Sequence, residues 1–136
     1  MGVEVDWGEE PPERTAAMEA ETRRLTEALV RLGARRVILF GSRAEGKPRA
    51  HSDIDLIAVM PCDPTWTFAR RLAEIGARID PRHATDLLVY TPEEFEQLRR
   101  TSVLVREAIA RGRVLFPAAD ETGEPEDDDG TEEGGR

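Results

Sequence analysis

The sequence predicts a mixed α/β domain in which a small mixed β-sheet has helices packed on one face. Two observations predict this class. Short apolar or β-branched segments, typical of buried strands, alternate with longer segments whose apolar residues recur with the 3.6-residue period of a helix. In addition, a chain of 136 residues is long enough for one hydrophobic core but not for two of ordinary size.

The first predicted helix covers residues 13–32. Its charged residues occupy other faces than its apolar stripe, which consists of Met18, Leu25, Leu29 and Leu32. Gly33 is expected to end the helix, because glycine readily adopts the left-handed conformation that follows a helix end.

Strands are predicted where short apolar runs occur, at residues 36–40, 53–60, 85–90 and 113–116. The segment between the first two strands contains Gly, Ser and Pro and is expected to be a loop with at most one helical turn. Further helices are predicted at residues 66–79 and 92–110, the latter with a break near residues 101–102. Thr91 and Glu94 are spaced as a capping box at the start of that helix.

The negative charge of the chain is concentrated in its last part. Residues 118–136 include nine acidic side chains and one arginine, so they contribute −8 of the net charge of −9. Such a composition cannot bury enough apolar surface to fold. We therefore expect a flexible N-terminus (1–12), a folded domain (13–117) and a disordered acidic tail (118–136).

Composition also argues against several classes of protein. Cys62 is the only cysteine, which excludes a disulfide framework and a cysteine zinc site. No segment approaches the roughly 18 apolar residues of a membrane span, and the acidic N-terminus is unlike a signal peptide, so we expect a cytoplasmic protein. Direct binding of nucleic acid is not expected, because the arginines are spread along every predicted helix.

Acidic residues at the starts of two predicted strands indicate a metal site. Asp53 and Asp55 are two residues apart, so their carboxylates project from the same face of a strand. If the strand that begins near Asp86 lies alongside, three carboxylates converge and repel one another unless a cation neutralises them. Oxygen ligands of this kind suit Mg²⁺ or Mn²⁺, and two such ions about 3.5–4 Å apart are a standard device for phosphoryl-type displacement.

A glycine and a serine follow the first predicted strand. Gly41 lets the backbone approach a ligand, and the hydroxyl and N–H of Ser42 can donate to phosphate oxygens. Arg43 and Lys47 lie in the same loop, where each either contacts a triphosphate or is a solvated loop charge. The loop also matches most of a P-loop, but Pro48 occupies the position that requires Ser or Thr for Mg²⁺.

These residues resemble the signature of the DNA polymerase β-like nucleotidyltransferase superfamily. That signature is a Gly-Ser pair, a spacer of about ten residues, and Asp-hydrophobic-Asp; here it reads Gly41-Ser42, residues 43–52 and Asp53-Ile54-Asp55. More narrowly, residues 20–117 resemble the small minimal nucleotidyltransferase (MNT) proteins, whose fold is a small mixed sheet with helices.

The resemblance implies an enzyme that transfers a nucleoside monophosphate from an NTP to a hydroxyl group and releases pyrophosphate. ATP is the expected substrate, which makes the protein an adenylyltransferase. By the same resemblance, Gly41 and Ser42 hold the triphosphate and Asp53 and Asp55 bind two Mg²⁺ or Mn²⁺ ions. Asp86 completes the second metal site and accepts the proton of the attacking hydroxyl.

The acceptor is expected to be a partner macromolecule, because the folded part is too small to include a separate acceptor-binding domain. For MNT proteins the resemblance suggests a helical HEPN-type toxin, which makes this chain its antitoxin. Either a homo-oligomer or a hetero-oligomer is compatible with this expectation. Two alternatives stay open. The chain is either a catalytically silent antitoxin that acts by contact alone, or a nucleotidyltransferase that acts on a small molecule such as an aminoglycoside.

Overall fold

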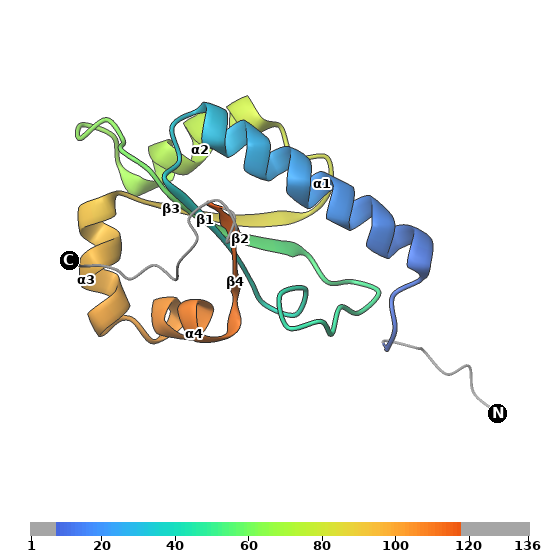
Figure 1. The fold of residues 1–136 in the computed structure, drawn as a ribbon. Coiled ribbons are helices and arrows are strands. Elements are labelled where there is room, and N and C mark those ends of the chain that lie inside the picture. Colours follow the sequence, from blue (N-terminus) through green and yellow to red (C-terminus); the bar gives the residue numbers. More distant parts are fainter. Residues whose placement is uncertain (1–7, 118–136) are drawn as a thin grey trace.

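The computed structural model describes residues 8–117, which contain both helices and strands (Figure 1). The predicted mixed α/β class is confirmed. The predicted acidic tail and residues 1–7 of the predicted flexible N-terminus lie outside the described residues. The elements are α1 (Pro12–Arg31), β1 (Arg36–Phe40), β2 (Ile54–Val59), α2 (Phe68–Ile79), β3 (Thr85–Tyr90), α3 (Pro92–Thr101), α4 (Val103–Arg111) and β4 (Arg113–Phe116).

The sheet has the strand order β3-β2-β1-β4 and is mixed, as predicted. Strand β1 runs antiparallel to both β2 and β4, whereas β2 and β3 are parallel. The register of the parallel pair places Asp55 opposite Asp86, and the antiparallel register places Phe40 opposite Asp55. The ends of β1, β2 and β3 that carry the candidate site residues therefore meet at one end of the sheet.

Helices cover both faces of the sheet, so the prediction that they pack on one face is wrong (Figure 1). On β1, Val37 and Leu39 belong to the core under α1 and α2, whereas Ile38 faces the opposite core with Phe95 of α3 and Val105 of α4. The physical reason is that the inner strands are buried on both sides. A strand of that kind is a continuous apolar run rather than an alternating one.

The predicted helix ends are largely confirmed. Gly33 follows α1 with φ 108°, and Thr91 forms the predicted capping box with Glu94 at the start of α3. The break expected near residues 101–102 is the boundary between α3 and α4, where the side chain of Ser102 accepts a hydrogen bond from the N–H of Val105. No helix in residues 8–117 combines the length and the apolar character needed to cross a membrane.

Candidate active site

Asp55 and Asp86 lie side by side at the start of the parallel strand pair. Strand β2 begins at Ile54, one residue later than predicted, so Asp53 immediately precedes it. Asp55 is two residues before Ile57 and projects from the same face, the one that α3 and α4 cover further along the sheet. The structure thus brings together the three acids that the sequence singled out.

The carboxyl group of Asp55 is electrostatically unfavourable in its charged form. Burial raises its pKa to about 6, and the charge and hydrogen bond of Asp86 and then the charge of Asp53 act in the same direction. Only the guanidinium of Arg43 opposes them among the causes of the shift. A half-buried carboxylate with two acidic neighbours is a group that gains from a nearby cation.

The donor set fits a divalent metal ion, although no complete cage is formed in advance. Within residues 8–117 no three His, Cys, Asp or Glu side chains are already arranged to hold a metal. Mg²⁺ seldom uses such a cage, because it commonly takes one or two carboxylates and fills its other positions with water and substrate phosphates. The assignment of Asp53, Asp55 and Asp86 as metal ligands stays a prediction.

Gly41 lies directly against the acid cluster, which consists of Asp53, Asp55 and Asp86. Its φ is +78°, and a Cβ atom placed on it would lie 2.2 Å from Oδ2 of Asp55. No other residue type fits this position without moving that carboxylate. Gly41 therefore fixes how close the loop backbone comes to the acids.

The loop after β1 begins with one tight turn. The N–H of Ala44 donates to the carbonyl of Gly41 at 3.0 Å, and the N–H of Lys47 donates to that of Ser42 at 3.0 Å. Among the described residues, the N–H groups of Ser42 and Arg43 find no backbone acceptor. N–H groups left open at the start of a turn are suited to bind phosphate oxygens.

Ser42 also joins the two ends of this loop. Its hydroxyl is hydrogen-bonded to that of Ser52 at 2.8 Å. Ser52 Oγ in turn accepts from the N–H of Arg49 at 2.8 Å. No role was predicted for Ser52 from the sequence, although its position directly before Asp53 was a signal that could have identified it.

The two basic residues predicted to contact a triphosphate are placed differently. Lys47 is exposed on the loop, where a ligand can reach it. Arg43 turns inwards, is 8% exposed, and bonds to the carboxylate of Glu10 and to the carbonyl of Ser52. Its guanidinium is thus committed to protein groups, and Glu10 is a neighbour that the sequence did not reveal.

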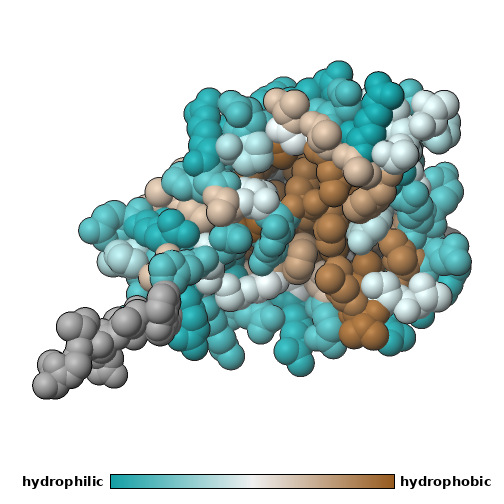
Figure 2. Space-filling model, turned by 180° about the vertical axis from the view of Figure 1, so that it is seen from behind, coloured by the Kyte–Doolittle hydropathy of each residue, from teal (hydrophilic) through white to brown (hydrophobic). Residues whose placement is uncertain are grey.

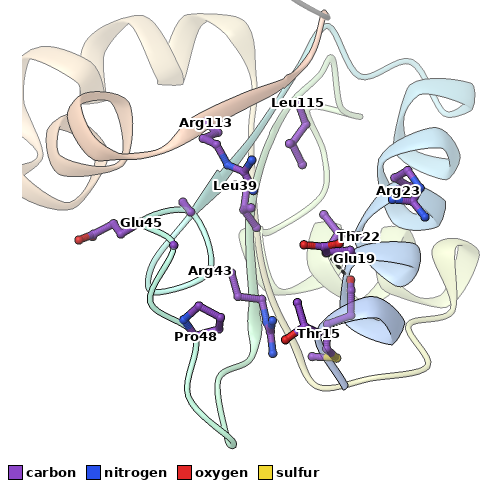
Figure 3. A pocket seen from close by; sticks show the side chains of 13 residues that line it. Thr15, Glu19, Thr22, Arg23, Leu39, Arg43, Glu45, Pro48, Arg113 and Leu115 are labelled. Carbon is purple, nitrogen blue, oxygen red and sulfur yellow. Dashed lines mark hydrogen bonds between the residues drawn. The ribbon is translucent and has the colours of Figure 1, made fainter. Parts of the chain in front are cut away.

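A cavity of about 640 Å³ lies behind the loop, between α1 and β4 (Figure 3). Arg43, Glu45 and Pro48 line it from the loop, and Leu39 lines it from β1. Leu39 belongs to the core on the α1 side of the sheet, whereas Asp55 projects from the other face. None of the three acids lines this cavity, so it is separate from the acid cluster.

Substitution of Asp55 is expected to stabilise the metal-free protein at neutral pH. Its folded-state pKa of about 6 exceeds the usual 3.8, so the folded state binds the proton more tightly and loses stability as pH rises between those values. In EDTA, we expect Asp55→Asn to gain about 1 kcal/mol over wild type at pH 7.5, allowing for the partial exposure of the group, and little at pH 4. Thermal and urea unfolding at both pH values measure this, and a less stable variant at pH 7.5 would contradict it.

Comparison with known proteins identifies the family of this chain. Residues 22–115 match the family described as nucleotidyltransferase domain. A candidate nucleotidyltransferase from Sulfolobus solfataricus has a similar structure, with 23% identity and a TM-score of 0.52 over 71% of this chain and 84% of the other. A chain from a toxin–antitoxin structure with AMP-PNP has 19% identity and a TM-score of 0.45 over 74% of this chain and 77% of the other.

None of the curated proteins compared matches this chain. The likeness to the solved structure from Sulfolobus supports the fold. The matched segment spans more than half of the chain and contains the turn at Gly41 and all three acids. The chain therefore belongs to the nucleotidyltransferase domain family.

Proposed function

We propose that this protein is a metal-dependent nucleotidyltransferase that transfers AMP from ATP to a hydroxyl group of a partner macromolecule. The observation that carries this proposal is the contact between Asp55 and Asp86, beside Asp53 and against the backbone of Gly41. Clustered carboxylates next to open N–H groups suit transfer of a phosphoryl-type group, since that chemistry depends on positioning and charge stabilisation.

Each group of the site has a role in the proposed reaction. A bound pair of Mg²⁺ or Mn²⁺ ions would neutralise the phosphates, and Asp53, Asp55 and Asp86 are the residues that would hold them. The turn at Gly41 and Ser42 orients the triphosphate. The acceptor oxygen forms a bond to the α-phosphorus, the bond to the β-phosphate oxygen breaks, and pyrophosphate leaves. Asp86, which is exposed, accepts the hydroxyl proton.

A macromolecular acceptor is supported by apolar surface on the side of the sheet from which Asp55 projects. Helix α4 lies on the face of the sheet from which Asp55 projects, and it exposes large apolar side chains together with the neighbouring strand β4: Val103, Leu104, Ile109 and Val114. Figure 2 also shows hydrophobic side chains gathered in a hollow within a hydrophilic face. Surface of this kind favours contact with a protein. We propose a helical HEPN-type toxin as that protein, with this chain as its antitoxin.

The alternatives differ from this proposal in a measurable way. We would incubate the protein with α-labelled ATP, Mg²⁺ and the protein encoded by the adjacent gene. Label on the neighbouring protein, lost in Asp53→Asn and in EDTA, is the expected result. A tight complex without label, under any NTP or metal, would instead identify an antitoxin that acts by contact alone. Label on an added aminoglycoside would identify a small-molecule enzyme.

A further inference from the structure

A buried ion pair joins the segment before α1 to the loop that starts at Gly41. The side chain of Glu10 is 1% exposed and that of Arg43 is 6% exposed. Nη1 of Arg43 donates to Oε2 of Glu10 at 2.9 Å, and Nη2 donates to Oε1. The two residues are 33 positions apart in the sequence, so this contact fixes two distant segments to each other.

Further hydrogen bonds hold Glu10 in place from α1. The hydroxyl of Thr15 donates to Oε2 of Glu10 at 2.7 Å, and Nε of Arg14 donates to Oε1 at 2.9 Å. Figure 3 shows Arg43 extending from the loop towards Thr15. The hydrogen bond from Arg43 is the main cause that lowers the pKa of Glu10, so Glu10 is a carboxylate at neutral pH.

The same network reaches the other end of the loop. The carbonyl oxygen of Ser52 accepts from Nη2 of Arg43 at 3.0 Å and from Nη2 of Arg14 at 3.2 Å. Ser52 directly precedes Asp53, and its hydroxyl is bonded to Ser42. The network thus ties the phosphate side of the site to the acid side.

A contribution to the stability of the fold does not by itself explain this buried ion pair. Burying two charges costs desolvation energy, and well-packed apolar side chains stabilise a protein as well or better. An arginine that is bonded to a carboxylate also fixes the geometry of the groups around it, because its planar guanidinium forms hydrogen bonds in fixed directions. The groups held in that geometry are the two ends of the loop.

We propose that Glu10 is a positioning residue for nucleotide binding. It holds Arg43, and through Arg43 it sets the position of the turn at Gly41 and Ser42 relative to Asp53 and Asp55. This inference rests on the proposed function. Glu10 lies outside the segment that matches the family, residues 22–115, so the match does not assign it this role.

The test replaces both members of the pair, because a single change would leave a buried charge without its partner and could unfold the protein. The variant is Glu10→Gln with Arg43→Gln. A matched control is Arg71→Gln with Glu94→Gln. The Arg71 side chain is 7% exposed and bonds to Glu94 at 2.7 Å and to the carbonyl of Val89, towards the end of β3 that lies away from Asp86. In both arginines Nε is buried without a hydrogen-bond partner.

We would measure kcat and KM for ATP, the Kd of AMP-PNP with Mg²⁺, and hydrogen exchange of the loop amides, at a temperature where both variants are folded. In the Glu10–Arg43 variant we expect KM and Kd to rise about tenfold while kcat falls less than about threefold, since the acids on β2 and β3 stay in place. The amides of Ala44 and Lys47, which close the turn, should exchange faster. The control should change KM less than about twofold.

Two results would overturn the inference: equal rises of KM in the variant and the control, or unchanged KM and unchanged loop exchange in the Glu10–Arg43 variant. A wild-type protein that neither binds nor turns over nucleotide would overturn the proposed function instead. The loop exchange is measured without nucleotide, so it still reports on the positioning of the turn in that case.

Discussion

Asp55→Asn is expected to lower kcat about 10³-fold at saturating ATP and Mg²⁺. Asp55 contacts Asp86, is repelled by the charge of Asp53 and lies against Gly41. It therefore occupies the centre of the cluster. A neutral amide removes one negative charge from the place where the proposed metal ions would bind. Such ions contribute several kcal/mol to the stabilisation of a phosphoryl-type transition state, and each 1.4 kcal/mol is about tenfold in rate.

The same variant separates loss of function from loss of fold. Since the raised pKa of Asp55 makes its charged form unfavourable, the amide is expected to be folded and, without metal, more stable than wild type at neutral pH. Asp63→Asn is the matched control, because Asp63 is exposed in the segment that follows the opposite end of β2. The rate is measured as release of pyrophosphate from ATP, in assays with and without the acceptor. Activity of Asp55→Asn within tenfold of wild type would remove Asp55 from the site.

The elements of the fold could be predicted because their signals are local. Apolar period, caps and turn residues define α1, the four strands and the capping box at Thr91, and none of these depends on distant residues. The neighbourhood of Asp55 and Asp86 was stated from sequence only as a condition. Its fulfilment depends on β2 and β3 being parallel and in register, which is a property of the assembled sheet.

Features that arise from long-range packing could not be predicted. The second layer of helices was missed because a continuous apolar run such as Val37-Ile38-Leu39 gives no alternation to assign to one face. Glu10 was missed because a pair of acids, Glu9 and Glu10, before Pro11 has the pattern of a solvated terminus. Only the folded chain brings it to Arg43, and for the same reason the sequence could not show that Arg43 turns inwards.

Gly41→Ala is expected to be the most damaging single-methyl change in the site. The new Cβ would lie 2.2 Å from Oδ2 of Asp55, far inside van der Waals contact, and the φ of +78° is unfavourable for alanine. The backbone conformation alone costs about 1–2 kcal/mol. Relief of the clash must move either the turn or the carboxylate, and a displacement of about 1 Å can lower the rate about 10²-fold. We therefore expect both a lower Tm and a loss of kcat/KM of about 10²-fold or more.

Gly33→Ala separates the two contributions. Gly33 has φ +108°, and a Cβ atom there would meet nothing within 4 Å. It lies after α1, away from the acids, so its substitution should lower Tm through backbone strain and leave kcat/KM within about twofold. If the two alanine variants lose stability to a similar extent and only Gly41→Ala loses activity, the close approach of the turn to Asp55 is what the chemistry requires. Equal activity in both would mean that the turn can withdraw from Asp55 without consequence, which contradicts the role given to Gly41.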